Sequence, residues 1–357
     1  MSGLREILTR RIRSEGPMSV AEYMALCLTH PEHGYYMHRD PLGAGGDFVT
    51  APEISQMFGE LIGLGMAQYW TDLGSPDPFV LAELGPGRGT LMADALRAAR
   101  AVPGFIEAAR LVLIEASPAL RAQQNRRLEA YRPGRADGMA ALPELPLLLV
   151  ANEFFDALPV RQFVRAETGW AERVIGLRQS EDALNFGLSP PARLETLEPA
   201  FAKTAPGEIV ETCAGAAALA HEIGLHIERL GGLALIIDYG GEPGRGDSLQ
   251  AVRGHRKVDP LATPGEADLT AHVDFAALAG ALPAGAVASK PTPQGVFLER
   301  LGITARARDL ASNLTGAALE THIAAHRRLT HPEEMGKLFK VMAITGSGAP
   351  VPPGTDP

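Results

Sequence analysis

A run of apolar residues at 79–84 ends in three glycines, and no other feature limits the possible folds of this chain as strongly. Gly85, Gly87 and Gly89 stand at every second position, and a helical pattern follows them. Glycine accepts positive φ angles and has no side chain, so a buried strand that turns through glycines lets a ligand approach bare backbone. The first turn of the next helix adds unpaired N–H groups that bind polar ligands. The pattern predicts an α/β protein with a site for a nucleoside-type cofactor.

Composition excludes several other classes of protein. The chain has 357 residues and a net charge of −9, and its Lys and Arg residues form nothing longer than short pairs. An extended nucleic-acid surface is therefore not expected. Cys27 and Cys213 stand apart without CxxC spacing, which suggests a reducing compartment, and we expect a bacterial cytoplasmic location. No apolar stretch approaches the length of a membrane span, so membrane insertion is not expected.

Strand and helix patterns alternate between residues 78 and 151. Strands are predicted over 79–84, 110–115 and 146–151, and helices over 89–100 and 118–130. Such alternation is typical of a parallel, doubly wound sheet.

The flanking regions follow other patterns. Helices are predicted at 3–14, 19–29 and 53–73, with Ser19 and Glu22 as a capping box, and an antiparallel insertion is predicted at 160–188 around Glu167–Gly169. The remaining predictions are helices over 215–230 and 270–281, a mostly helical segment over 295–328, strands over 233–238 and 337–345, and a frayed tail after 345. We divide the chain into a helical N-terminal region with a glycine-rich loop (1–75), a core (76–160 and 231–345) and an inserted accessory lobe (161–230).

Acidic residues lie beside the carboxyl ends of the predicted strands, where ligands bind in an open parallel sheet. Glu83 comes two residues before the glycines, and Glu115 ends the second strand, 30 residues beyond Gly85. An acid at that strand end can accept hydrogen bonds from both ribose hydroxyls of an adenosine. The alternative is that the glycines make only a tight turn and Glu115 is a solvated strand end.

The spacing of the glycines bears on which cofactor is bound. The dinucleotide fingerprint is GxGxxG, whereas the third glycine here comes one residue early and Glu83 precedes the turn. The run Glu-x-Gly-x-Gly-x-Gly resembles the first motif of class I S-adenosylmethionine-dependent methyltransferases. In that class the loop wraps the aminocarboxylate end of the cofactor instead of a pyrophosphate.

The remaining motifs make the resemblance more specific. The chain resembles the MidA family, bacterial and mitochondrial methyltransferases that include an assembly factor of respiratory complex I, from about residue 4 to 345. The segments that carry the resemblance are 46–55 with 58–59, 83–91, 115–120, 151–160, 231–240, 268–275, 294–298 and 334–340.

The resemblance implies a class I, Rossmann-like methyltransferase core with the helical and inserted regions as accessory parts. It implies S-adenosyl-L-methionine as cofactor, with Glu115 on the ribose. The methionine end would be lined by Glu83, Gly85, Pro86, Gly87 and Gly89. In mitochondrial relatives the implied reaction is symmetric dimethylation of an arginine in the 49-kDa subunit of complex I (NADH dehydrogenase). We expect a subunit of that type as protein partner.

Residues after the strand at 146–151 are the candidates for handling the methyl acceptor. A guanidinium nucleophile needs carboxylates that hold its fork and localise a lone pair on one nitrogen. Glu153 and Asp156 have this chemistry, and Asn152 could supplement them. The alternative is a turn whose acids cap the next helix.

Two further residues, Asp47 and Thr50, lie in the glycine-rich loop that could close over the cofactor, although a plain structural turn is as consistent with the sequence. Weaker candidates are Asp238, Tyr239, Asp268, His272 and Asp274, with Asp268 equally suited to cap the helix that follows. His322 and His326 have the spacing of metal ligands on a helix, but no third ligand is evident, so we predict a solvated helix face and no metal site.

Two other functions remain open from the sequence alone. An NAD-dependent oxidoreductase is disfavoured by the early third glycine and by the lack of an evident hydride-handling His or Lys. A non-catalytic assembly chaperone that keeps the cofactor fold is disfavoured by the intact run from Glu83 to Gly89 and by Glu115.

Overall fold

A mixed sheet forms the centre of the molecule. The computed structural model describes residues 3–38, 49–178, 183–240 and 244–356. The sheet has the strand order β14-β16-β10-β5-β2-β3-β4, with β15 paired to β16. Its strands are β2 (Phe79–Leu84), β3 (Ala109–Ile114), β4 (Gly134–Ala136), β5 (Leu147–Asn152), β10 (Gly232–Tyr239), β14 (Ala286–Ala288), β15 (Thr292–Pro293) and β16 (Phe339–Gly346).

The direction of the strands confirms the doubly wound α/β class. Strands β4, β3, β2, β5 and β10 are parallel to their neighbours, and β16 is antiparallel to β10. The chain runs outward from β2 through β3 to β4 and returns to pair β5 on the other side of β2. The topological switch point therefore lies between β2 and β5, where open α/β sheets bind their ligands.

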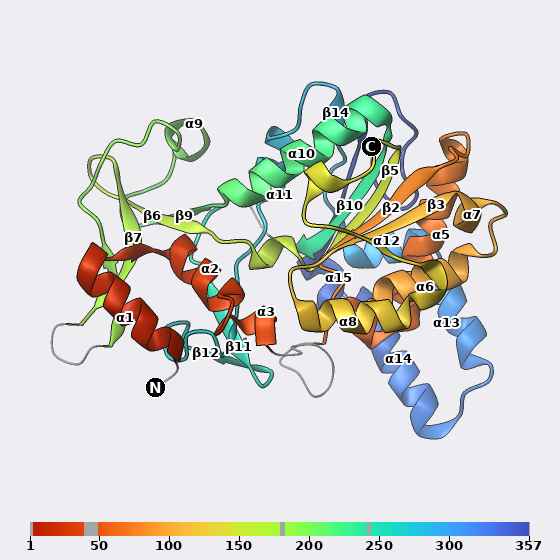
Figure 1. The fold of residues 1–357 in the computed structure, drawn as a ribbon, viewed down its shortest axis with the longest axis horizontal. Coiled ribbons are helices and arrows are strands. Elements are labelled where there is room, and N and C mark those ends of the chain that lie inside the picture. Colours follow the sequence, from red (N-terminus) through yellow and green to blue (C-terminus); the bar gives the residue numbers. More distant parts are fainter. Residues whose placement is uncertain (1–2, 39–48, 179–182, 241–243, 357) are drawn as a thin grey trace.

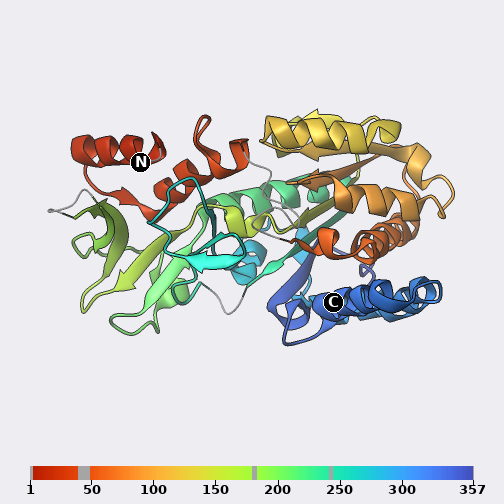
Figure 2. The same ribbon diagram turned by 90° about the horizontal axis from the view of Figure 1, so that it is seen from below.

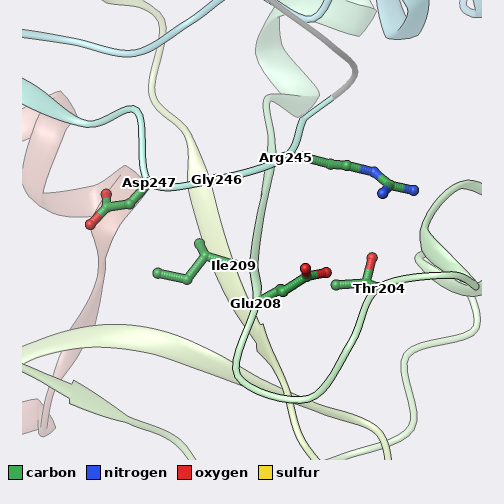
Figure 3. A pocket seen from close by; sticks show the side chains of 6 residues that line it. All are labelled: Thr204, Glu208, Ile209, Arg245, Gly246 and Asp247. Carbon is green, nitrogen blue, oxygen red and sulfur yellow. The ribbon is translucent and has the colours of Figure 1, made fainter.

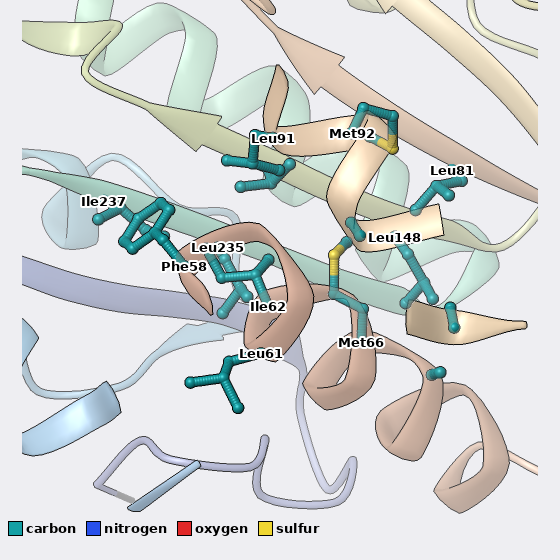
Figure 4. Close-up of a cluster of buried hydrophobic side chains, with 14 of the residues drawn as sticks. Phe58, Leu61, Ile62, Met66, Leu81, Leu91, Met92, Leu148, Leu235 and Ile237 are labelled. Carbon is teal, nitrogen blue, oxygen red and sulfur yellow. The ribbon is translucent and has the colours of Figure 1, made fainter. Parts of the chain in front are cut away.

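Both faces of the sheet are buried, which explains the continuous apolar runs in its central strands. Successive residues point to opposite faces, so Leu81 and Leu148 join one apolar cluster and Val80 and Leu149 the other. Figure 4 shows the first cluster, where Phe58, Ile62 and Met66 meet the strands.

Helices cover the two faces of the sheet (Figure 1). The helices of the core are α5 (Gln56–Asp72), α6 (Thr90–Ala99), α7 (Phe105–Ala108), α8 (Pro118–Arg127), α10 (Ala214–Leu230), α11 (Phe275–Gly280), α12 (Gln294–Arg300), α13 (Ile303–Ala311), α14 (Gly316–Thr330) and α15 (Met335–Leu338). Residues of α5 and α6 join the first apolar cluster, and residues of α10 and α11 join the second.

The contact between α5 and α6 is unusually close because of two glycines one turn apart. A Cβ atom on Gly59 would lie 2.8 Å from the Leu91 carbonyl oxygen, and one on Gly63 would lie 2.4 Å from the Ala95 carbonyl oxygen. Protein interiors leave no room for such an added methyl group without backbone movement. The two glycines therefore set the distance between α5 and the helix that follows the glycine turn.

A separate lobe lies beside one end of the central sheet (Figures 1 and 2). One sheet of the lobe has the order β1-β7-β6-β9 with β8 on β7, and a smaller sheet has the order β12-β11-β13. The bounds are β1 (Met18–Ser19), β6 (Arg161–Arg165), β7 (Trp170–Leu177), β8 (Leu184–Leu188), β9 (Ile209–Thr212), β11 (Gln250–Arg253), β12 (Arg256–Val258) and β13 (Asp268–Thr270). The hairpin of β6 and β7 confirms the predicted antiparallel insertion.

The N-terminal region divides between the lobe and the core. Residues of α1 (Gly3–Glu15) and α2 (Val20–Thr29) share an apolar cluster with β7, β11 and β13, whereas α4 (Ala51–Ile54) and α5 contact the core helix α6. The short helices α3 (Tyr35–His38) and α9 (Glu198–Phe201) complete the lobe. The capping box of Ser19 and Glu22 at the start of α2 is confirmed. The division of the chain into three regions stays a prediction.

Two local predictions were wrong, those for the segment 270–281 and for the C-terminal tail. The segment 270–281 is helical only in α11, since 268–270 pairs with β11, and the cap of α11 is Asp274, whose carboxylate accepts the Ala277 N–H at 2.9 Å. By contrast, the segment 295–328 is mostly helical, as predicted, and forms three helices with breaks at Gly302 and Thr315. The C-terminal tail is packed, because Asp356 forms an ion pair of 2.9 Å with Arg300.

In the part of the chain that the structure describes, no helix has both the length and the apolar character that crossing a bilayer requires.

Candidate cofactor and acceptor site

The glycine turn follows β2 and leads into α6 as predicted. Gly85, Gly87 and Gly89 have φ angles of 60°, 53° and 75°, which other L-residues rarely adopt. The turn is closed by the Gly89 N–H, which donates to the Pro86 carbonyl at 2.7 Å. A Cβ atom on Gly85 would lie 2.7 Å from Cδ2 of Phe154. The turn after β2 and the loop after β5 are therefore in direct contact at the switch point.

Glu83 carries a buried carboxyl group without a complete set of partners. Its side chain is 3% exposed, and its Oε2 atom has no hydrogen-bond partner among the residues described. Burial, followed by the charge of Glu115, raises the pKa of Glu83 to about 8. An ammonium group would supply both the donors and the charge that this carboxyl lacks. Glu83 therefore fits the amino group at the methionine end of S-adenosylmethionine.

Glu115 directly follows β3 and presents a fixed carboxylate. One oxygen accepts the Ser117 N–H at 2.8 Å, and the other accepts Nε2 of Gln124 at 3.3 Å. Burial raises the pKa of Glu115. A carboxylate has about four lone-pair sites, and the backbones of Ala116 and Ser117 and the Gln124 amide use three of them, so Glu115 can still accept a hydrogen bond from a ribose hydroxyl.

The loop after β5 brings the three predicted acceptor residues together. Asn152 ends β5, and its Nδ2 donates to Oε1 of Glu153 at 3.0 Å, while its buried Oδ1 has no partner in the described residues. Glu153 has a φ angle of 51°, which is uncommon for a residue with a side chain. Burial raises the pKa of Glu153 to about 7. Strain of this kind is often found at functional sites.

Asp238, at the end of β10, holds this loop in place. Its Oδ2 accepts the N–H groups of Phe154, Phe155 and Asp156 at 3.2, 3.0 and 3.2 Å, and its Oδ1 accepts the Tyr239 N–H at 2.8 Å. The side chain is fully buried. Asp238 therefore organises the backbone under the acceptor residues, a role that its position at a strand end did not specify.

Asp156 is the most buried acid of the loop, at 7% exposure. Burial raises its pKa to about 6, although a hydrogen bond from the Tyr239 phenol favours the ionised form. Burial and the nearby charge of Asp156 also raise the pKa of Asp238 well above its usual range. The acids around the switch point thus favour a cationic ligand, since a positive charge would relieve their mutual repulsion.

The lobe supplies a second group of polar residues next to Asp156. The Ala271 N–H donates to the Asp156 carbonyl at 2.9 Å, and the Tyr36 hydroxyl donates to Asp268 at 2.7 Å. Asp268 is therefore a partner of Tyr36, and it is not the helix cap that the sequence equally allowed. His272 stacks edge-on against Tyr239, with ring centroids 5.5 Å apart.

The segment before α5 connects the two loops. The Ala51 N–H donates to Oε1 of Glu153 at 2.8 Å, and Glu53 accepts from the Thr90 hydroxyl and lies 3.7 Å from Arg88. Thr50 stands at the start of α4, where its side chain makes no capping hydrogen bond. Asp47 lies outside the described residues. No sequence pattern indicates this role of Glu53, because only the fold brings it to the glycine turn.

Glu153 also caps α4, so the structural alternative considered for the acids holds in part. That alternative expected a helix just after the acids, whereas α4 begins at Ala51, 102 residues before Glu153. The carboxylate has one oxygen engaged by Ala51 and Asn152. Among the residues that the structure describes, no hydrogen bond reaches its other oxygen, which could therefore accept one from a ligand.

The predicted solvated face of His322 and His326 is wrong. Both residues are half-buried between α13 and α14, with His322 bonded to the Ala307 carbonyl at 2.9 Å and His326 to the Thr304 hydroxyl at 3.1 Å. These are packing contacts. In the described ranges, no group of three His, Cys, Asp or Glu residues could hold a metal ion.

A pocket of about 380 Å³ lies in the lobe, apart from the switch point (Figure 3). Its walls come from the segment around β9 and from the chain after β10, and none of the predicted site residues lines it. The lining residues are Thr204, Glu208, Ile209, Arg245, Gly246 and Asp247.

Fold and site together define a class I, Rossmann-like methyltransferase that uses S-adenosylmethionine. Residues 61–292 match the family described as "Putative S-adenosyl-L-methionine-dependent methyltransferase", and the chain belongs to this family. The cofactor question that the glycine spacing raised is thereby answered in favour of S-adenosylmethionine over NAD.

Relatives with known names support the same class. The chain is 37% identical to the mitochondrial protein arginine methyltransferase NDUFAF7 homolog of Drosophila melanogaster, over 96% of this chain and 84% of that protein. It is 34% identical to the NDUFAF7 of Homo sapiens, over 94% of this chain and 82% of that protein. A Burkholderia thailandensis protein solved with bound S-adenosyl-homocysteine is 30% identical, with a TM-score of 0.82 over 98% of this chain and 93% of that one.

The Glu83→Gln variant tests the role of the buried carboxyl. The raised pKa of Glu83 means that the folded protein keeps a proton that the unfolded chain releases between about 4.5 and 8, so folding stability falls as pH rises through that window. We expect Glu83→Gln without cofactor to melt at a higher temperature than the wild type at pH 8 and at a similar one at pH 5.

The same variant should bind S-adenosylmethionine about tenfold more weakly, because the charge that pairs with the ammonium group is lost. Thermal melts at both pH values and calorimetry with the cofactor give the two readouts. Unchanged cofactor affinity would contradict the placement of Glu83.

Proposed function

We propose that this protein transfers methyl groups from S-adenosylmethionine to an arginine side chain of a protein. The observation that carries the proposal is the loop after β5, which contacts the glycine turn through Phe154 and carries Glu153 and Asp156, two acids with raised pKa values. A guanidinium group offers a fork of N–H donors and a positive charge, and both complement such a pair of carboxylates.

The proposed reaction follows from the chemistry of these residues. Bound S-adenosylmethionine supplies a methyl group on a positively charged sulfur. The lone pair of a guanidinium nitrogen of the acceptor forms a bond to the methyl carbon as the carbon–sulfur bond breaks, and the electron pair of the broken bond stays on the sulfur. The proton released from that nitrogen goes to Asp156 or Glu153, whose raised pKa values suit the acceptance of a proton near neutral pH.

The acceptor protein is proposed from the resemblance to the MidA family. We infer that it is a subunit of NADH dehydrogenase, of the 49-kDa type, and that the product is a symmetrically dimethylated arginine formed during assembly of the complex. The names of the relatives as protein arginine methyltransferases support the class of acceptor. A cytoplasmic location is part of the same proposal.

The Asp156→Asn variant tests the acceptor side of the site. The amide keeps the size of the side chain but cannot accept the proton, so we expect the transfer rate to fall by about 100-fold. Affinity for S-adenosylmethionine should stay within about threefold, since Asp156 lies on the acceptor loop. Transfer of labelled methyl groups to arginine, measured beside calorimetry with the cofactor, separates the two effects.

The wild-type enzyme should also lose kcat/KM as pH falls through about 7 and then 6, because the carboxylates that hold the guanidinium become protonated.

Wild-type transfer rates in Asp156→Asn would contradict the role assigned to Asp156. Cofactor binding without any transfer in the wild type would favour the non-catalytic chaperone instead.

A further inference from the structure

Gln124 is a fully buried polar residue of α8 that the sequence did not single out. It lies between the two parts of the proposed cofactor site, the glycine turn and Glu115. A buried amide is stable only when its donors and its acceptor find partners, so the identity of those partners shows what holds it there.

Both functions of the Gln124 amide are used. Its Nε2 donates to the Gly87 carbonyl at 2.6 Å and to Oε2 of Glu115 at 3.3 Å. Its Oε1 accepts a hydrogen bond from Nη1 of Arg135. One side chain thus joins the middle of the glycine turn to the acid expected to bind the ribose.

Arg135 holds this side chain in place beside Gly89. Nη2 of Arg135 donates to the Arg121 carbonyl at 3.1 Å and to Oδ1 of Asn125 at 2.6 Å, so the guanidinium is anchored to α8. A Cβ atom on Gly89 would lie 3.6 Å from Cγ of Gln124, so this side chain packs directly beside the glycine turn.

We propose that Gln124 is a positioning residue for S-adenosylmethionine, which sets the separation between the glycine turn and Glu115. The inference rests on the placement of the cofactor given above. The cofactor must engage the turn with its methionine end and Glu115 with its ribose at the same time. A side chain that holds the turn and Glu115 at one fixed separation before binding lowers the entropic cost of ordering them when the cofactor binds.

The test is calorimetry of the full-length protein with S-adenosylmethionine. Gln124→Met keeps the length and the burial of the side chain but removes all three hydrogen bonds. We expect the dissociation constant to rise about tenfold, the usual effect of losing a hydrogen bond to a charged group. Arg126→Gln, a change at an exposed position of the same helix, is the matched control and should leave the constant within about twofold.

A double-mutant cycle with Glu115→Gln distinguishes positioning from general support of the fold. If Gln124 acts through Glu115, its substitution should weaken binding much less in the Glu115→Gln background than in the wild type. Full additivity of the two effects would overturn the inference, and so would an unchanged dissociation constant in Gln124→Met alone.

If Gln124→Met does not fold, Gln124→Glu keeps the shape of the side chain and the Arg135 partner, and it should bind S-adenosylmethionine even more weakly. Unchanged affinity there would equally overturn the inference.

The single variants separate this inference from the cofactor placement. Weaker binding in Glu115→Gln with wild-type binding in Gln124→Met refutes only the role of Gln124. Wild-type binding in both variants refutes the placement of the cofactor itself.

Discussion

Replacing Gly63 with alanine should lower the free energy of unfolding by about 2 kcal/mol. Alanine is favoured over glycine inside a helix by about 1 kcal/mol, so propensity alone predicts a more stable protein. The added methyl group would, however, lie 2.4 Å from the Ala95 carbonyl oxygen and 2.5 Å from the Ala95 Cα atom. Backbone atoms of α6 cannot move aside without disturbing the sheet beneath them, and overpacking of this kind costs about 1–3 kcal/mol or more.

Gly65 provides the matched control in the same helix. A Cβ atom there would lie 3.5 Å from a methyl group of Leu301, which is an ordinary contact. Gly65→Ala should therefore be neutral or raise stability by up to about 1 kcal/mol. Denaturant unfolding of both variants measures the difference. Equal stability of the two would show that α5 and α6 are not held together as closely as described.

Replacing Gly87 with valine should weaken the binding of S-adenosylmethionine by at least about 100-fold. The residue has a φ angle of 53°, which strains a branched side chain by about 1–2 kcal/mol. Its carbonyl is held by Gln124 at 2.6 Å, so the turn cannot relax without losing that bond. A side chain at this position would also stand where the cofactor approaches the backbone.

Gly74→Val is the control for backbone strain alone. Gly74 has a φ angle of 85°, and a Cβ atom there would have nothing within 4 Å. Both variants should lose stability through strain, but only Gly87→Val should lose cofactor affinity in calorimetry. Near wild-type affinity in Gly87→Val would mean that the cofactor does not lie on this turn.

The core of the fold could be predicted because its signals are local. The strand at 79–84, the positive φ angles of Gly85, Gly87 and Gly89, and the capping box at Ser19 each depend on residues close in the sequence. The parallel order follows from the alternation of strands and helices. The small sheet of β11, β12 and β13 was not predicted, because its strands are short and join an apolar cluster with residues distant in sequence, among them residues of α1 and α2.

The site could be predicted only in its parts that lie at strand ends. Glu83, Glu115 and Glu153 are found by counting from the strands, whereas Gln124, Glu53 and Tyr36 act through contacts with residues distant in sequence. Asp238 was noted at a strand end, but its role under the acceptor loop depends on three backbone N–H groups that no sequence pattern specifies.

Mass spectrometry of NADH dehydrogenase subunits tests the central claim most directly. Subunits from cells that lack this gene would be incubated with the wild-type protein and isotope-labelled S-adenosylmethionine. The account predicts label on one arginine of a 49-kDa-type subunit, as symmetric dimethylarginine, and almost none with the Asp156→Asn protein. Subunits that carry no more label after the wild-type protein than after Gly87→Val would contradict it.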